Sequence, residues 1–242
     1  MAVGTSVSIH RAIAAFCASG AGEHHRYRSW EHCYRYFRQA RSEGLTADRG
    51  NAALQLAFYL ASWGMYRGSS FLLQHTYTVH RSVIDVIAER RFNDLWAADF
   101  GASETDDRFI PLVLELIVDL KQAYKPFAPA TGSAQPTDAL ITKIILGTLG
   151  CLPARDRYFN DGFKTAGFRY SSLDDNFIRC VLSFCNKHRG EFEKERRLIE
   201  QRSGIHYPLM KLVDMYFWQI GYQLDMEARI NLRSQVVKTT KS

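Results

Sequence analysis

Helical periodicity runs through nearly the whole of this sequence and constrains the fold more than any other feature. In residues 23–41, aromatic and apolar side chains fall on one arc of a helical wheel, and arginines fall on the adjacent arc. Glycines close several of these segments, and Gly44 is a typical helix stop. The one alternation typical of a β-strand covers residues 75–80. The pattern predicts an all-α protein of about eight helices.

The predicted helices are joined by short polar or glycine-containing turns. Asp156 stands where a helix N-cap is expected, Thr137 or Asp138 begins the helical segment before it, and Asp107 is placed to cap the segment that starts at Arg108. The segments predicted to be helical are residues 8–18, 23–41, 47–63, 71–90, 108–124, 137–149, 156–165, 172–202 and 208–232.

The chain of 242 residues is long enough for one large domain or two small ones. Residues 128–136 form the clearest linker, rich in alanine and proline. A connection of this length more often joins two helices of one domain. We therefore expect one helical domain over residues 1–242, with residues 128–136 as the place for any subdivision.

Charge and composition narrow the classes of partner. The formal net charge is +6, and it is divided as +5 for residues 1–84, −6 for residues 85–119 and +7 for residues 120–242. This basic excess favours an anionic ligand, such as nucleic acid or a nucleotide. The sequence has no uncharged apolar run of about 18 residues, so we expect no membrane-spanning helix and no membrane partner. The five cysteines lie in apolar surroundings, as buried thiols of a cytoplasmic protein do.

The predicted anion-binding residues are arginines on one helix face and at turns. Arg28, Arg35 and Arg38 share one side of the helix predicted for residues 23–41, where a phosphate backbone could bind. The glycine-flanked turn at residues 64–70 could bind an anion through backbone N–H groups. The residues predicted to bind a ligand are Arg28, Arg35, Arg38, Arg67, Ser69, Arg155 and Arg157.

The segment Thr142 to Phe159 is the most distinctive in the chain. An apolar helix carries the lone Lys143, the chain turns at Gly150 and Pro153, and Asp156 begins another helix. This passage resembles the helix–turn–Asp passage of helix-hairpin-helix DNA glycosylases, although the Gly-x-Gly hairpin of that family is missing and the Lys–Asp spacing is shorter. The resemblance implies catalysis at a sugar centre by Asp156 with Lys143 as nucleophile. The alternative is that Asp156 is only a helix cap and that the Lys143 amine reaches water.

Arg26 and His32 form a second catalytic candidate. Their Arg-x5-His spacing resembles the signature of HEPN ribonucleases, a family of helical bundles that often pair as dimers. The resemblance implies metal-independent RNA cleavage, with His32 in proton transfer and Arg26 on the phosphate. Six residues place the two side chains about 120° apart on a regular helix. They would converge only if Arg26 precedes the helix; otherwise Arg26 is solvated and His32 is half-buried.

We expect no metal and no cofactor. Cys180, Cys185 and His188 could all face a metal from one helix, but at these spacings they span about 140°, which is too wide for one tetrahedral ion. Asp214 lies in a nearly apolar helix, and a buried carboxylate there needs a cationic partner, which we expect from another helix.

The sequence therefore predicts a cytoplasmic helical protein that binds an anionic ligand, nucleic acid or a nucleotide. One alternative is a nucleic-acid-processing enzyme that uses Lys143 and Asp156 or Arg26 and His32. The other is a non-catalytic scaffold that forms a homodimer, which would require a broad apolar surface patch.

Overall fold

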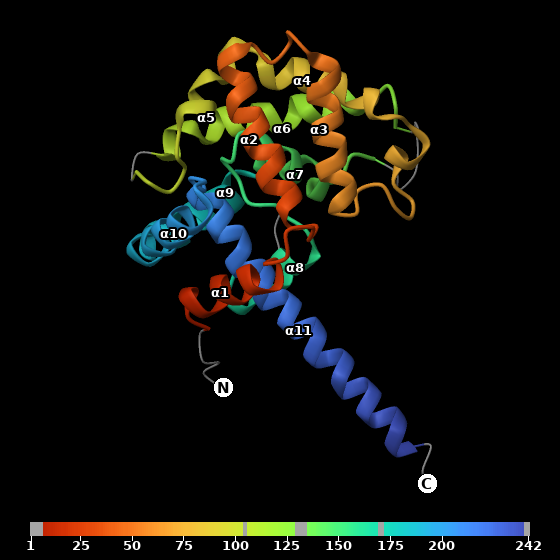
Figure 1. The fold of residues 1–242 in the computed structure, drawn as a ribbon, viewed down its shortest axis with the longest axis vertical. Helices are drawn as coiled ribbons and strands as arrows, with labels where there is room; N and C mark the ends of the chain where they lie inside the picture. The colour runs from red at the N-terminus through yellow and green to blue at the C-terminus, as the bar shows by residue number, and fades with distance from the viewer. Residues whose placement is uncertain (1–6, 104–105, 129–134, 169–171, 240–242) are drawn as a thin grey trace.

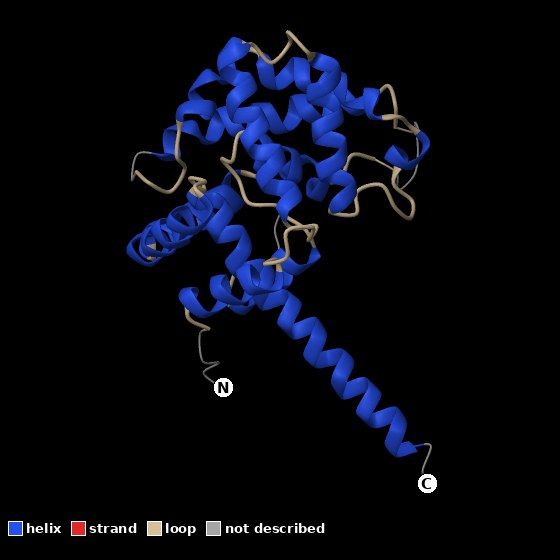
Figure 2. Ribbon diagram, viewed as in Figure 1, coloured by secondary structure: helices blue, strands red, loops and turns tan. Residues whose placement is uncertain are grey.

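The computed structural model describes residues 7–103, 106–128, 135–168 and 172–239, and side chains as far as residue 232. Within these ranges every regular element is a helix, so the all-α prediction is confirmed (Figure 2). The described part of the chain contains eleven α-helices rather than about eight. None of them has the length and the apolar run needed to cross a bilayer.

The elements before residue 128 are α-helices joined by short 3₁₀ helices. The α-helices are α1 (Ile9–Ser19), α2 (Arg28–Glu43), α3 (Arg49–Ser62), α4 (Arg81–Ala88), α5 (Asn93–Ala97) and α6 (Ile110–Tyr124). The 3₁₀ helices are η1 (Phe71–Gln74), η2 (Tyr77–His80), η3 (Arg90–Phe92) and η4 (Asp106–Phe109).

The single helix predicted over residues 71–90 is wrong. His75 and Thr76 adopt extended backbone, which separates η1 from η2 and α4. Nε2 of His75 lies 3.0 Å from the carbonyl oxygen of Phe127, so the residue at the break makes a tertiary contact. This segment carries both the alternation typical of a strand and the periodicity typical of a helix. Two short 3₁₀ helices form here in place of one continuous α-helix.

The second half contains five α-helices. They are α7 (Asp138–Thr148), α8 (Arg157–Thr165), α9 (Asp175–Lys187), α10 (Arg189–Ser203) and α11 (Leu209–Thr239). The helix predicted over residues 172–202 is divided at His188, whose backbone is not helical and whose ring pairs with Glu191 at 2.8 Å. The linker at residues 128–136 lies mostly outside the described residues.

Side-chain caps fix where several helices begin. Each capping residue accepts a hydrogen bond from a backbone N–H in the first turn, a contact that contributes about 1 kcal/mol. The capping residues are Ser8, Asp48, Thr137, Asp156 and Asp174. The prediction that Asp107 caps a helix is wrong, because η4 covers this residue and α6 begins after Phe109 without a side-chain cap.

Helix α7 lies at the centre of the fold. All its residues from Leu140 to Thr148 are buried, and it packs against α2, α3 and α6. The indole N–H of Trp30 on α2 donates to the carbonyl oxygen of Leu146 at 3.0 Å. This bond fixes α2 against α7, and the turn after α7 leads directly to Asp156.

Helix α11 is the longest element and passes α1 and α8 before it extends away from the rest of the molecule (Figure 1). It crosses α8 at two glycines. A Cβ atom at Gly162 would lie 2.0 Å from the carbonyl oxygen of Phe217, and one at Gly221 would lie 2.0 Å from that of Tyr158. The two backbones are therefore in direct contact at this crossing.

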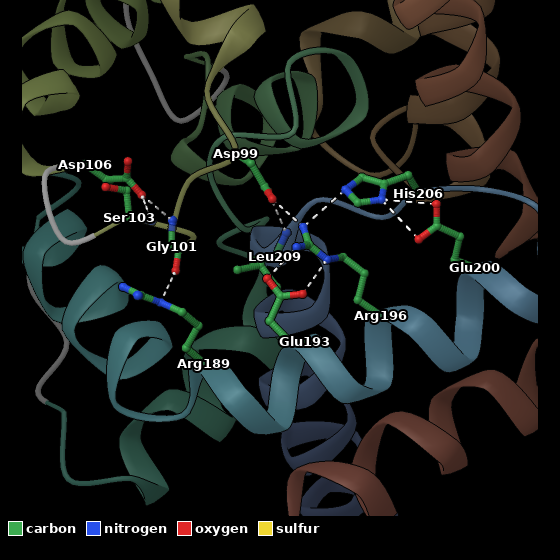
Figure 3. A network of polar contacts seen from close by, with 10 residues as sticks. All are labelled: Asp99, Gly101, Ser103, Asp106, Arg189, Glu193, Arg196, Glu200, His206 and Leu209. Atoms are coloured by element: carbon green, nitrogen blue, oxygen red, sulfur yellow. Dashed lines mark hydrogen bonds and ion pairs between the residues drawn. The ribbon is translucent and has the colours of Figure 1, made fainter.

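A polar network holds α10 against the start of α11 (Figure 3). Arg196 donates to the carboxylates of Asp99 and Glu193, and its Nη1 lies 3.2 Å from Nε2 of His206. The second oxygen of Asp99 accepts the backbone N–H of Leu209 at 3.3 Å. Asp99 thus connects α10 to the first residue of α11.

The loop that carries Asp99 is fixed at Gly101, which has a φ of +90°. Its N–H donates to Asp106 at 2.7 Å, and its carbonyl oxygen accepts from Arg189 at 3.1 Å (Figure 3). A Cβ atom here would lie 2.4 Å from Sγ of Cys185, so both the conformation and the space require glycine.

Candidate ligand-binding site

Lys143 and Asp156 meet across the turn between α7 and α8. Nζ of Lys143 donates to Oδ2 of Asp156 at 2.8 Å, while Oδ1 of Asp156 accepts the backbone N–H of Phe159 at 3.1 Å. The Lys143 side chain is only 3% exposed, and that of Asp156 is 18% exposed. Asp156 is both a helix cap and an ion-pair partner, and the Lys143 amine does not extend into water.

A second buried pair lies on α11. Nζ of Lys211 is 2.8 Å from Oδ2 of Asp214, and Oδ1 of Asp214 accepts the backbone N–H of Ala154 at 3.1 Å. Burial raises the pKa of Asp214, although the charges of Lys211 and Lys143 oppose that shift. The expectation that the cationic partner of Asp214 comes from another helix is wrong, because Lys211 lies three residues earlier on the same helix face.

Aromatic rings join the two pairs into one cluster. Nζ of Lys143 lies 5.1 Å from the centroid of the Trp63 ring, and Nζ of Lys211 lies 5.5 Å from it. The Lys211 amine is also 5.1 Å from the ring centroids of both Phe16 and Trp30. Cations at such distances are attracted by the ring faces. Rings from α1, α2 and the end of α3 therefore surround the amine of Lys211.

A cavity of about 370 Å³ lies beside this cluster, between α1, α2, α10 and α11. Its apolar wall includes three aromatic rings and several small side chains, and its polar groups come from α2, α10, α11 and the segment between α10 and α11. The apolar residues that line it are Ala14, Phe16, Cys17, Ala18, Ala21, Tyr27, Trp30, Ile199 and Met215. The polar residues that line it are Arg28, Glu31, Arg202, Ser203, Tyr207 and Lys211.

The charged groups of this cavity are arranged in pairs, with one cation in excess. Nη1 of Arg28 binds both oxygens of Glu31, at 2.9 and 2.8 Å, and the Tyr207 hydroxyl donates to Glu31 at 2.5 Å. The hydrogen bond to Glu31 raises the pKa of the Arg28 guanidinium. Lys211 is paired with Asp214, so the exposed Arg202 gives the cavity a net positive charge.

Cys17 also lines the cavity. Burial raises the pKa of its thiol, and the charges of Lys211 and Arg202 lower it less than burial raises it. The thiol is therefore protonated at neutral pH and is not an activated nucleophile.

The predicted arginine face of α2 is partly engaged by the protein itself. Arg28 is bound to Glu31, and Nη1 of Arg38 donates to the carbonyl oxygen of Trp96 at 2.5 Å. Arg35 is exposed on the same helix. The structure therefore gives one of these three arginines a place in a cavity and leaves the other two on the surface.

Arg26 and His32 are not brought together. Arg26 precedes α2, as convergence would require, but its guanidinium lies over the rings of Tyr27 and Trp63, at 5.5 and 5.6 Å. His32 is exposed on α2, and no hydrogen bond joins it to Arg26 in the described residues.

Arg67 and Ser69 lie in the predicted turn after α3. Both are exposed, and they line a second cavity of about 220 Å³ together with Thr137, the N-cap of α7. The turn and the start of α7 are thus adjacent, which the sequence did not indicate.

Arg155 and Arg157 flank Asp156 in different environments. Arg155 is buried, with its Nη1 3.4 Å from Asp138 and its guanidinium 4.7 Å from the ring of Phe177. Arg157 is exposed and pairs with Asp225 at 3.1 Å. Both line a third cavity, of about 440 Å³, which Asp156 also lines.

Three residues that line the first cavity were not identified from the sequence: Arg202, Tyr207 and Lys211. Lys211 had a visible signal, since the spacing Lys-x-x-Asp in an apolar segment is typical of a buried pair on one helix face. Arg202 and Tyr207 had none, because only tertiary packing brings them to α1 and α2.

Large apolar side chains are exposed in two main places among the described residues. One pair, Leu54 and Phe58, lies on α3. The other group lies on the extended part of α11 and comprises Leu224, Met226, Ile230 and Leu232. Homodimerisation through either surface stays a prediction.

No group of three or more His, Cys, Asp or Glu residues in the described ranges could hold a metal ion. Comparison with protein-family models finds no family that matches the chain, and searches of curated proteins and solved structures find no match.

Proposed function

We propose that the protein binds a small anionic ligand with a planar ring, of the nucleoside monophosphate class, in the cavity beside Lys211. The observation that carries the proposal is the composition of this cavity: it has aromatic walls, and Arg202 is one cation more than the pairs of Arg28 with Glu31 and of Lys211 with Asp214. Its volume of about 370 Å³ is also within the range of small-molecule sites.

The aromatic residues provide the surface for a base. Phe16 lies in α1, Trp30 lies in α2, and Tyr27 immediately precedes α2; all three line the same space. Their ring faces are already covered by neighbouring rings or by the Lys211 amine, so they present ring edges to a ligand. Edge-to-face contacts between aromatic rings contribute about 0.5–1.5 kcal/mol beyond the area that they bury, and they depend little on which base is present. The apolar wall therefore supports binding of a ring, without specifying one base.

The cations provide the contacts for a phosphate. Arg202 is exposed and Lys211 is buried, so positive groups lie at both the outer and the inner part of the cavity. Arginine binds phosphate through two parallel N–H donors, which makes Arg202 the principal phosphate contact.

Isothermal titration calorimetry with AMP, GMP, CMP and UMP, and with the matching nucleosides, tests this proposal. We expect Arg202→Gln to weaken nucleotide binding about tenfold and to leave nucleoside binding unchanged. Arg197→Gln is the matched control, because Arg197 is exposed on the same helix and is absent from the cavity lining. Failure of every nucleotide to bind at about 1 mM would contradict the proposal.

Nucleic acid is the larger ligand that the charge distribution predicted. Its binding would have to use Arg35 and the exposed parts of Arg28 and Arg38. Each phosphate contact would contribute about 0.7–0.9 to the dependence of log affinity on log salt concentration. A steep salt dependence with RNA or DNA oligomers, which disappears when the three arginines are replaced by Gln, would favour this ligand over a mononucleotide.

A second candidate function, catalysis at a sugar centre, is favoured by the 2.8 Å contact of Lys143 with Asp156. Asp156 lines the third cavity and is the more exposed partner, so its carboxylate is the group that a substrate would meet. Asp156→Asn should abolish release of damaged bases from DNA while keeping the cap of α8, since Asn is as good an N-cap as Asp. An unchanged rate in this variant would exclude the role.

A further inference from the structure

We propose that Lys211 forms a covalent imine with an aldehyde or ketone group of an anionic ligand in the cavity between α1, α2, α10 and α11. This inference rests on the proposed function, since it concerns the same cavity, and it adds a chemical class to the ligand: a carbonyl compound with a planar ring and an anionic group.

Lys211 is placed so that its amine can react with a ligand inside the cavity. Lys211 lines the cavity, and its Nζ lies 5.1 Å from the ring centroids of Phe16 and Trp30, which line the same space. Only 4% of its side chain is exposed, so a bound ligand would separate the reaction from bulk water. Buried lysines are the ones that proteins use for imine chemistry.

Asp214 supplies the proton acceptor that the reaction needs. An ammonium group is not a nucleophile, so the amine must first lose a proton, and Oδ2 of Asp214 lies 2.8 Å from it. Burial raises the pKa of this carboxyl group, which makes it a better proton acceptor than an exposed aspartate. The backbone N–H of Ala154 holds the other carboxylate oxygen in place.

The step is balanced without any further reagent. The free amine of Lys211 adds to the carbonyl carbon, and the C=O bond becomes a C–OH bond in a carbinolamine. Asp214 returns the proton to this hydroxyl group, which leaves as water as the C=N bond forms. One water is released for each imine, and no oxidation or reduction occurs.

Lys143 provides an internal comparison. It has the same kind of partner at the same distance and lies against Trp63, but it is absent from the residues that line this cavity. A lysine that is buried and paired but not beside the cavity should therefore remain unmodified. The difference in modification between Lys211 and Lys143 therefore measures how much the cavity contributes to the reaction.

The experiment uses pyridoxal 5′-phosphate as the probe, because it combines a planar ring, an aldehyde and a phosphate. The intact protein is incubated with the probe, the imine is reduced with sodium borohydride, and the modified lysines are mapped by peptide mass spectrometry. We expect Lys211 to be modified about tenfold faster than the exposed lysines Lys125, Lys164 and Lys187, and Lys143 to remain unmodified. Excess AMP should protect Lys211 alone.

Lys211→Arg is the variant that removes the nucleophile while it keeps a cation beside Asp214, and the wild-type map does not depend on whether this variant folds. Modification of exposed lysines alone would overturn the imine proposal. If calorimetry still shows nucleotide binding in that case, the proposed function stands. If Lys211 is modified but nucleotides do not bind, the imine stands and the nucleotide class is wrong.

Discussion

Nζ of Lys143 lies 2.8 Å from Oδ2 of Asp156, across the turn between α7 and α8. The two partners differ in their access to water, since the lysine side chain is 3% exposed and the aspartate side chain is 18% exposed. The consequences of removing either partner should therefore be unequal. Loss of the carboxylate leaves a buried ammonium group unpaired, whereas loss of the ammonium group leaves a carboxylate that still reaches water.

Asp156→Asn should consequently lower the free energy of unfolding by about 3 kcal/mol, because it removes the counter-charge of Lys143 but keeps the helix cap. Lys143→Met should cost less, since Met fills the buried space with an apolar side chain. Urea unfolding of both variants measures the difference. A larger loss for Lys143→Met would contradict this account of the pair.

For Lys211 and Asp214, both partners are buried, so the two single variants should be similar. Lys211→Met and Asp214→Asn should each lower the free energy of unfolding by about 3–5 kcal/mol. The double variant should lose less free energy of unfolding than the two single variants lose together, because no buried charge then remains. A double-mutant cycle from urea unfolding measures this coupling, and strictly additive losses would show that the pair does not interact energetically.

His80 should make stability depend on pH. It is fully buried between the hydroxyl groups of Tyr66 and Tyr124, at 2.6 and 2.5 Å, and burial lowers its pKa to about 3. The unfolded chain takes up this proton near pH 6.5 and the folded chain does not, so the free energy of unfolding should fall as the pH falls from about 6.5 towards 3.

The slope from this one group is about 1.4 kcal/mol per pH unit within that window. His80→Gln keeps a donor and an acceptor but does not titrate, so it should be less stable near neutral pH and should lose less stability on acidification. Urea unfolding of both proteins at several pH values tests this. Parallel curves for the two proteins would show that His80 is not the titrating group.

The crossing of α8 and α11 should not tolerate a methyl group. Alanine normally stabilises a helix by about 1 kcal/mol relative to glycine. At Gly162 and Gly221, however, the added Cβ would lie 2.0 Å from a carbonyl oxygen, so we expect a loss of about 3 kcal/mol or more. Gly190→Ala in α10 is the matched control, because no atom lies within 4 Å of its added Cβ. Thermal unfolding should separate the two crossing variants from the control.

Much of the fold could be predicted from the sequence because helix signals are local. Asp156 is a cap as expected, Thr137 is one of the two residues expected to begin its helix, and α7 is central because apolar residues cover most of its surface. The breaks at His75 and His188 were missed because neither residue is a strong helix breaker. The ring of His75 contacts the distant Phe127, whereas His188 contacts Phe184 and Glu191 on the two helices that it separates.

The candidate site was predictable only in part. The contact between Lys143 and Asp156 follows from a helix, a short turn and a cap, all of which the sequence contains. The cavity beside Lys211 requires α1 and α2 to meet α10 and α11. Helical periodicity shows that each of these helices has an apolar face, but it does not show which faces pack together.

The rings of Phe16 in α1 and Trp218 in α11 pack edge to face, 5.5 Å apart. About 200 residues of chain separate them, so during synthesis at about 5–20 residues per second α1 waits roughly 10–40 s for this neighbour. The apolar face of α1 is meanwhile open to chaperones or to non-native contacts. The α1 segment is therefore where we expect chaperone binding to a nascent chain, and the ligand cavity is among the last parts of the molecule to form.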